Sequence, residues 1–145
     1  MSLPDPAGVD AAAARLGTRI FRTPVVGSRT LDEMLGHALL FKCENLQRVG
    51  AFKARGALNA LLWMKEQGSL PRCAVAYSSG NHAQAVAWAA RELGMKAEIY
   101  MPEASSAVKR AATEAYGARV HLRASRAEME REAERAGAEP GCVLV

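Results

Sequence analysis

Apolar residues recur along most of this chain in two alternating spacings. Where they fall at every third or fourth position they form one face of a helix, and glycine follows most of these stretches. The helices are expected over residues 54–67, 83–93, 108–115 and 124–136. Shorter, mostly apolar runs are typical of strands, which are expected over residues 73–77, 97–101, 119–122 and 142–145. The alternation predicts an α/β fold, an open parallel sheet with flanking helices in a three-layer sandwich.

The first fifty residues follow a less regular pattern. Residues 1–9 contain prolines and a glycine and are expected to be extended, with Asp10 capping a helix that ends at Gly17. The later elements of this part are expected to be an extended segment over 22–26, a short helix over 28–36, a strand over 38–43 and a loop over 44–51.

The composition is that of an ordinary globular protein, with 50% hydrophobic and 23% charged residues in a chain of 145. The length suits one domain with its own core. The net charge is +4, but the basic residues are scattered and no basic run alternates with aromatics, so nucleic-acid binding is not expected. We see no apolar run of membrane-spanning length and no signal pattern, which predicts a cytoplasmic protein without a membrane partner.

The cysteines and histidines do not indicate a metal site. Cys43, Cys73 and Cys142 lie far apart, each beside apolar residues, and buried free thiols in a reducing cytoplasm explain them better than disulfides. His37 and His121 are expected to be structural or exposed. No metal-ligand spacing and no Ser/His/Asp arrangement is found, so no metal is predicted.

Lys53 is the first candidate for chemistry, because it stands at a corner between an apolar strand and a long helix. Phe52 precedes it and Gly50 lies just before, so the backbone and the ring can approach a ligand closely. A lysine held between apolar groups has its charged form disfavoured, and a neutral amine attacks carbonyl carbons. The alternative is a solvated charge on a helix face. We favour the first interpretation and expect Lys53 to form a Schiff base.

The second candidate is the corner Tyr77-Ser78-Ser79-Gly80-Asn81-His82, which follows the strand at 73–77. Ligands gather at the carboxyl ends of strands in open α/β sheets. Hydroxyl groups, an amide and backbone N–H groups at a helix N-terminus bind an anion such as a carboxylate or phosphate. The alternative is simple helix capping by Ser78 or Ser79. The Gly-x-Gly-x-x-Gly spacing of a dinucleotide site is missing.

Taken together, the motifs resemble one enzyme family. Phe52-Lys53-Ala54-Arg55-Gly56-Ala57 followed by Ser78-Ser79-Gly80-Asn81-His82-Ala83-Gln84 resembles the serine/threonine dehydratases (ammonia-lyases) and serine racemases, pyridoxal-phosphate enzymes of the tryptophan-synthase-β-like fold (fold type II). The likeness extends over nearly the whole chain, through Arg22-Thr23-Pro24, Lys42-Cys43-Glu44-Asn45-Leu46-Gln47, Met101-Pro102-Glu103 and Ala115-Tyr116-Gly117-Ala118.

This resemblance implies roles for the residues at both corners. Lys53 would be the Schiff-base lysine, holding pyridoxal 5′-phosphate as an aldimine, and later the base at the substrate Cα. Phe52 would lie against the cofactor ring, and Asn81 would hydrogen-bond the 3′-oxygen of the pyridine. The loop Ser78–His82, with Gly80 at its centre, would grip the carboxylate of a small amino-acid substrate. The implied reaction is the dehydration and deamination of L-threonine or L-serine to a 2-oxo acid and ammonia.

Two positions depart from the commonest pattern of the family. Many threonine dehydratases have alanine at the position of Ser79, whereas serine racemase-like members have a serine that acts on the ring face opposite the lysine. Racemisation needs an acid/base group on each face of Cα. Racemisation of serine or aspartate, and dehydration of 3-hydroxyaspartate, therefore stay open as alternatives. Ala51 replaces the usual serine and removes a hydroxyl group.

The resemblance also implies a domain division. Family members are about twice as long as this chain, in keeping with two domains. Residues 1–50 would be an N-terminal arm with a first strand belonging to the larger domain, residues 51–145 would be the small α/β domain, and the C-terminal half with the phosphate loop would be absent. A homo-oligomer, a dimer or tetramer, is expected of the longer protein. Two alternatives for this chain remain, a non-catalytic truncated domain and a generic nucleotide-binding α/β domain.

Overall fold

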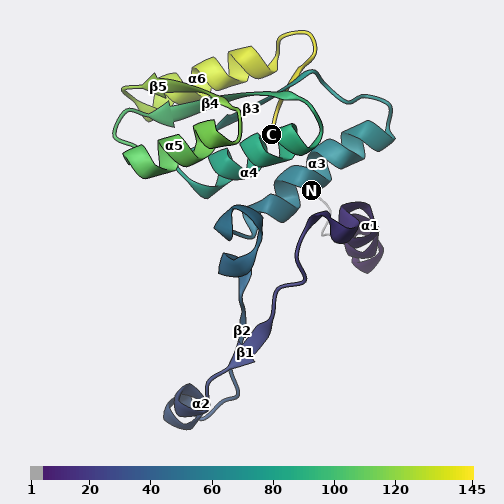
Figure 1. The fold of residues 1–145 in the computed structure, drawn as a ribbon, viewed down its shortest axis with the longest axis vertical. Helices are drawn as coiled ribbons and strands as arrows, with labels where there is room; N and C mark the ends of the chain where they lie inside the picture. The colour runs from purple at the N-terminus through teal and green to yellow at the C-terminus, as the bar shows by residue number, and fades with distance from the viewer. Residues whose placement is uncertain (1–4) are drawn as a thin grey trace.

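A parallel sheet of four strands forms the centre of the molecule in the computed structural model, which describes residues 5–145. Its strands are β3 (Cys73–Tyr77), β4 (Lys96–Pro102), β5 (Arg119–Arg123) and β6 (Cys142–Leu144), in the order β5-β4-β3-β6 (Figure 1). The four buried residues of β3 are apolar because helices cover both faces of a parallel sheet.

Helices on the two faces of the sheet complete a three-layer sandwich (Figure 1). The helices are α3 (Lys53–Glu66), α4 (Asn81–Glu92) and α5 (Ala107–Ala115) on one side and α6 (Arg126–Gly137) on the other. Side chains alternate along β3, so Ala74 and Ala76 join the large core cluster whereas Val75 joins a smaller one beneath α6. The predicted fold class is confirmed.

Helix α4 is the most deeply buried helix of the described chain, because it lies between the sheet and α3. Every residue from Ala85 to Ala90 is buried, and most of them are alanine, which lets α3 and the sheet approach the helix axis closely. Large side chains from the neighbouring elements fill the remaining space, among them Leu58, Leu61, Ile99 and Met101. The core therefore fixes the position at which α4 begins.

The N-terminal part forms an arm, of which the first helix lies beside α3 and the segment with the two short strands extends away from the sandwich (Figure 1). It contains α1 (Pro6–Leu16), β1 (Val25–Gly27), α2 (Arg29–Leu35), β2 (Leu40–Lys42) and the 3₁₀ turns η1 (Gly17–Arg19), η2 (Glu44–Leu46) and η3 (Arg48–Gly50). β1 and β2 pair antiparallel with each other and are exposed on both faces. The predicted strand at 38–43 is thus shorter, and the predicted loop at 44–51 contains two helical turns.

The prediction for the start of the first helix is wrong. Asp5, not Asp10, is its cap, and the Asp5 carboxylate accepts a hydrogen bond from the Gly8 N–H at 2.6 Å. Pro6 suits the first helical position, since its fixed φ is helical and its missing N–H would have no helical partner there. Residues 6–9 are therefore helical rather than extended, and residues 1–4 of that prediction lie outside the described residues.

Two further expectations meet the structure. In residues 5–145 no helix is both long and apolar enough to cross a membrane. All three cysteines carry free thiols, but Cys43 and Cys142 are only partly buried, so burial of the thiol is confirmed at Cys73 alone.

Candidate active site

The loop after β3 is shaped by backbone pairing with β4. The Ser78 N–H donates to the Tyr100 carbonyl at 3.0 Å, which extends the β3–β4 ladder by one residue. The Ser78 hydroxyl then accepts a hydrogen bond from the Gly80 N–H at 3.2 Å and closes the turn. Gly80 is the N-cap of α4, so Asn81 and His82 occupy its first turn. The predicted carboxylate-binding residues are therefore contiguous at the carboxyl end of the sheet.

The N-terminus of α4 has no side-chain cap. Four other helices in the described chain are capped by an oxygen of the residue before them: Asp5, Ser28, Ser106 and Ser125. Glycine at position 80 offers no such oxygen, and neither Ser78 nor Ser79 takes its place. Simple capping by these serines is thus excluded. The first backbone N–H groups of α4 therefore have no side-chain acceptor, and they lie at the positive end of the helix dipole, as the predicted anion site requires.

Lys53 is the first residue of α3, the other helix that begins without a side-chain cap. Both Lys53 and Phe52 are exposed, and the lysine Nζ lies 5.5 Å from the centroid of the Phe52 ring. The expectation of a lysine enclosed by apolar groups is therefore wrong for the residues described here. Lys53 makes no hydrogen bond to the loop Ser78–His82 within residues 5–145, so these residues alone do not join the two corners by a direct polar contact.

A strained turn connects the two corners. Val49 has φ 54° and ψ 14°, a left-handed conformation that a β-branched residue rarely adopts, and Gly50 follows with φ 66°. This turn, η3, packs against α4 and stands directly before Phe52 and Lys53. Val49 itself packs against the main core. Strain of this kind is held by the surrounding packing and clusters at functional sites. Nothing in the spacing of residues in the sequence predicts it.

A polar network ties the arm to α3 close to Lys53. The Glu44 carboxylate accepts hydrogen bonds from Arg55 Nε and Nη2, each at 2.7 Å, and from the Thr23 hydroxyl at 2.6 Å. The Arg55 hydrogen bond is the main reason why the pKa of Glu44 falls from 4.5 to about 2. The buried Gln47 side chain binds both backbone polar groups of Phe21. Glu44 and Gln47 thus stabilise the segment that leads into α3.

A cavity of about 300 Å³ lies beside the candidate anion site. Tyr77, Ser78, Ser79, Pro102, Arg126 and Met129 line it. Lys109 approaches the same loop from α5, because a Cβ atom built on Gly80 would lie 3.6 Å from the Lys109 Nζ. The predicted site residues Ser78 and Ser79 therefore share a cavity that has basic side chains nearby, a feature that the sequence reasoning missed.

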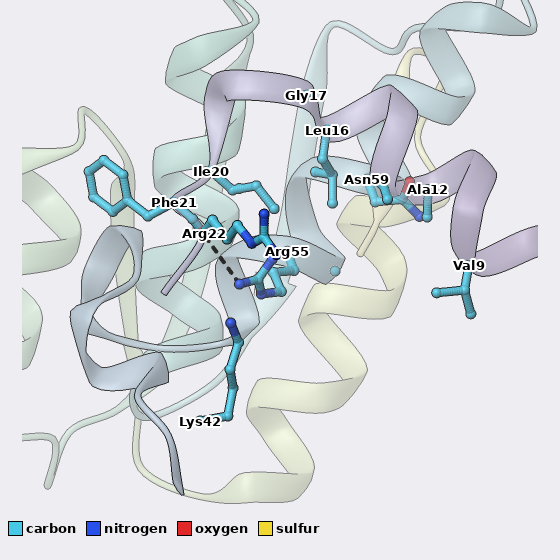
Figure 2. Close-up of a pocket in the computed structure, with 12 residues that line it drawn as sticks. Val9, Ala12, Leu16, Gly17, Ile20, Phe21, Arg22, Lys42, Arg55 and Asn59 are labelled. Carbon is cyan, nitrogen blue, oxygen red and sulfur yellow. Dashed lines mark hydrogen bonds between the residues drawn. The ribbon is translucent and has the colours of Figure 1, made fainter. Parts of the chain in front are cut away.

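A larger cavity, of about 540 Å³, lies between the arm and α3 (Figure 2). Its apolar wall is formed largely by α1, and the basic side chains Arg22, Lys42 and Arg55 reach into it. Arg55 donates a hydrogen bond to the Phe21 carbonyl at 3.2 Å, as the figure shows. None of the predicted site residues lines this cavity.

His82 and His121 contact different parts of the sheet and do not lie in one site. His82 Nε2 lies 2.9 Å from the Val145 carbonyl oxygen, which holds the ring toward β6. His121 Nε2 lies 2.5 Å from a Glu98 carboxylate oxygen, and its ring stacks on Tyr100. Within residues 5–145, no cluster of three His, Cys, Asp or Glu side chains could hold a metal ion.

Comparison with known proteins identifies the family to which this chain belongs, and the match includes both candidate corners. Residues 16–145 match the family described as "Pyridoxal-phosphate dependent enzyme". The chain belongs to this family. The L-threo-3-hydroxyaspartate ammonia-lyase of a Pseudomonas species is 54% identical over 109 residues, covering 75% of this chain and 34% of that protein. The L-threonine ammonia-lyase of Geobacter sulfurreducens is 44% identical over 114 residues, covering 79% of this chain and 28% of that protein.

A solved structure shows the same architecture. Maize serine racemase superposes with a TM-score of 0.90 at 37% identity, covering 99% of this chain and 44% of that one. The family and the fold predicted from the motifs are confirmed. This chain spans about a third of the length of the curated relatives that it matches.

The residues present fit the cofactor of the family. Pyridoxal phosphate carries an aldehyde, which a primary amine can bond, and its substrates carry a carboxylate. Lys53 supplies an exposed amine at the start of α3, and α4 supplies an N-terminus free of a side-chain cap. Asn81, exposed in the first turn of α4, adds an amide donor.

Proposed function

We propose that this chain is the lysine-bearing part of an ammonia-lyase that converts L-threonine or L-serine into a 2-oxo acid and ammonia. The observation that carries the proposal is the start of α4, where Gly80 leaves the helix without a side-chain cap beside Ser78 and Ser79. An N-terminus of this kind binds the carboxylate of an amino acid. Membership of a pyridoxal-phosphate dependent family supports the same reading.

Each residue at the two corners has a task in this reaction. The Lys53 amine would bond covalently to the cofactor and then take the proton from the substrate Cα. Phe52 would lie against the cofactor ring, and the Asn81 amide would donate to the ring oxygen. Backbone N–H groups of Gly80 to His82 and the Ser78 hydroxyl would hold the carboxylate. When bound, the cofactor withdraws electrons from Cα and so makes its proton acidic.

Racemisation is a related function that Ser79 supports. Its side chain lines the cavity next to α4, where a hydroxyl group could exchange a proton with the face of Cα opposite Lys53. The measurement is the formation of D-serine and of pyruvate from L-serine. A Ser79→Ala variant of the natural protein is expected to lose D-serine formation and keep pyruvate formation. Equal loss of both products would contradict a role for Ser79 on the second face.

Dehydration of 3-hydroxyaspartate is a second candidate, favoured by the basic side chains at the same loop. Lys109 lies close to Gly80, and Arg126 lines the cavity with Ser78 and Ser79. Either cation could bind the second carboxylate of a dicarboxylic amino acid. Lys109→Met is then expected to raise KM for L-threo-3-hydroxyaspartate and leave KM for L-threonine unchanged. A parallel rise for both substrates would contradict this specificity.

The arm is proposed to belong to a second, larger domain. Its exposed apolar side chains, among them Val25, Val26, Leu40 and Phe41, would pack against the rest of the protein. The same larger domain would enclose Lys53 and bind the cofactor phosphate. We further propose a homo-oligomer in the cytoplasm, where the three free thiols would stay reduced.

Borohydride trapping tests the assignment of Lys53. The natural protein is incubated with pyridoxal phosphate, reduced, digested and mapped by mass spectrometry. The pyridoxyl group is expected on Lys53, and Lys53→Ala is expected to abolish both the label and 2-oxo acid formation. Lys65→Ala, an exposed lysine of the same helix, is the matched control and should keep both. Label and turnover that survive Lys53→Ala would refute the proposal.

An assay of the isolated 145-residue chain tests whether this chain alone is catalytic or is a non-catalytic domain. With pyridoxal phosphate and L-threonine it is expected to label on Lys53 without releasing ammonia, because the proposed second domain is needed to enclose the site. Ammonia release by this chain alone would contradict the two-domain requirement. The label on Lys53 is measured separately, so this result leaves the assignment of the lysine intact.

A further inference from the structure

Cys73 and Cys142 are direct neighbours in the sheet. Their Cα atoms are register partners on β3 and β6, which run parallel. Paired residues of adjacent strands lie about 5 Å apart, which is inside the Cα separation of about 4.4–6.8 Å that a disulfide requires. Both side chains are on the face covered by α6, in the cluster that contains Val75 and Met129.

Two glycines allow β6 to come this close. A Cβ atom on Gly137, at the end of α6, would lie 2.8 Å from the Leu144 Cβ, so a larger residue there would push β6 away. Gly141 has φ 81° and lies against the Arg72 guanidinium, where a Cβ atom would be 2.6 Å from its Nε. The Gly141 carbonyl accepts hydrogen bonds from the N–H groups of Arg72 and Cys73. The pairing of the two cysteines is therefore built into the turn before β6.

A cavity of about 410 Å³ reaches both thiols. It is lined on one side by polar side chains, including Glu98 and His121, and on the other by the end of α6. Cys73 is 8% exposed and Cys142 is partly exposed. A small oxidant can enter a space of this size, whereas the third cysteine, Cys43, lies in the arm.

We propose that Cys73 and Cys142 form a dithiol that hydrogen peroxide oxidises to an intramolecular disulfide. The Cys142 sulfur attacks one peroxide oxygen, the O–O bond breaks, and a sulfenic acid and one water result. The Cys73 sulfur then attacks the Cys142 sulfur, the S–O bond breaks and a second water leaves with the thiol proton. In sum, two thiols are oxidised and one peroxide is reduced to two waters.

The environment of the two thiols supports this order of events. Burial, followed by the neighbouring Cys142, raises the pKa of the Cys73 thiol to about 11. Cys73 is therefore a neutral thiol near pH 7 and a slow first nucleophile towards peroxide. The more accessible Cys142 reacts first. Its oxidation removes the thiolate that helps to raise the Cys73 pKa, and Cys73, its register partner, then attacks the adjacent sulfenic acid before further oxidation.

The disulfide would tie an edge strand to the strand that leads into the Ser78–His82 loop. Among residues 5–145, β6 pairs with β3 alone, over three residue pairs. Beyond β6, the Val145 carbonyl lies against His82. A covalent bond at the other end of this short ladder would hold β6 in register. This inference does not depend on the proposed function, because its test measures thiols and not turnover.

The experiment uses the chain with Cys43→Ser, so that only the two paired thiols remain. It is treated with hydrogen peroxide, and free thiols are counted after denaturation. We expect both thiols to disappear together, a monomer lighter by two hydrogen atoms, and a tryptic disulfide linking Cys73 to Cys142 that dithiothreitol reverses. Amide exchange of residues 142–145 should slow, and the midpoint of thermal unfolding should rise, because the bond closes a long loop.

Single variants provide the control. With Cys73→Ser the sulfenic acid on Cys142 has no resolving thiol, so dimedone should label Cys142 and the protein should gain oxygen instead of losing hydrogen. Circular dichroism checks that the Cys43→Ser chain folds, with and without the additional Cys73→Ser change. Oxygen addition on Cys142 while Cys73 is still present, a disulfide between two chains, or two thiols that survive peroxide would each overturn the proposal.

Discussion

Arg55 binds the Glu44 carboxylate through both Nε and Nη2, each at 2.7 Å, and so joins the arm to the first turn of α3. The two side chains are 33% and 18% exposed, which makes this pair less accessible to water than an ordinary surface ion pair. Arg55 stands two residues after Lys53. The Glu44–Arg55 pair therefore helps to fix the position of the first turn of α3, which carries the Lys53 amine.

We expect Glu44→Gln to lower the free energy of unfolding by about 2 kcal/mol, because Arg55 loses its charged partner in a partly buried place. The measurement is urea unfolding at neutral pH. Glu33→Gln is the matched control, since the Arg29–Glu33 pair has side chains that are 93% and 67% exposed. It should change stability little. Equal effects of the two variants would show that the Glu44–Arg55 pair is an ordinary surface contact.

The same pair predicts a dependence of stability on pH. The pKa of Glu44 is lowered in the folded chain from 4.5 to about 2, chiefly by the Arg55 hydrogen bond. The carboxylate therefore contributes stability that is complete above pH 4.5 and is lost as the pH falls toward 2. The stability difference between the wild-type chain and Glu44→Gln should shrink over this range. If the stability difference between the wild-type chain and Glu44→Gln stays constant from about pH 6 to about pH 3, this linkage is contradicted.

Gly80→Asp should separate the stability of α4 from its capacity to bind an anion. An aspartate oxygen at the N-cap can accept a hydrogen bond from the first turn of α4, and a Cβ atom at this position would meet no atom closer than the Lys109 Nζ at 3.6 Å. We expect a gain of about 1 kcal/mol in unfolding free energy and a loss of binding of an amino-acid carboxylate. Gly80→Ala is the control, because it adds a Cβ atom without a cap. Unchanged carboxylate binding in Gly80→Asp would argue against the proposed anion site.

Replacement of Val49 should reveal the strain in η3. Val49→Gly and Val49→Ala both remove the packing of the side chain on the core, but only glycine adopts φ 54° without strain. We expect the glycine variant to be more stable than the alanine variant by about 1 kcal/mol, against the usual order of these two residues. Thermal unfolding of both variants measures this. An alanine variant of equal or higher stability would mean that the turn is not strained.

Two glycine-to-alanine changes should have opposite signs. Gly137→Ala places a Cβ atom 2.8 Å from the Leu144 Cβ and should lower stability by about 2 kcal/mol as β6 shifts. Gly56→Ala, inside α3 with open space around it, should raise stability by about 0.5–1 kcal/mol through helix propensity. Urea unfolding measures both. A neutral Gly137→Ala would contradict the close packing of α6 on β6.

Much of the fold follows from local spacing. The helical repeat that begins at Ala54 and the apolar run at 73–77 each predict an element that the structure contains, because period and length are properties of neighbouring residues. The start of the first helix was misplaced by five residues. Asp5 and Asp10 are equally good caps by type, and the choice between them depends on Pro6 and on where the chain enters the helix.

The candidate site divides in the same way. Lys53 and the run Ser78–His82 are visible in the sequence because each is a cluster of unusual neighbours. Their surroundings are not, since exposure of Lys53, strain at Val49 and the approach of Lys109 to Gly80 arise from packing between separate elements. The missing side-chain cap on α4 also required the structure, because a serine one or two residues earlier could equally have been the cap.

By itself the sequence determined the α/β alternation, the lysine corner and the serine-rich loop, and the resemblance of these motifs to a known family indicated the family. Only the tertiary structure decided which distant residues meet: Glu44 with Arg55, His82 with Val145 and Cys73 with Cys142. The physical reason is that helix and strand periods are encoded by residues a few positions apart. Strand order and register are set instead when the whole core closes, and only then do side chains from separate elements become neighbours.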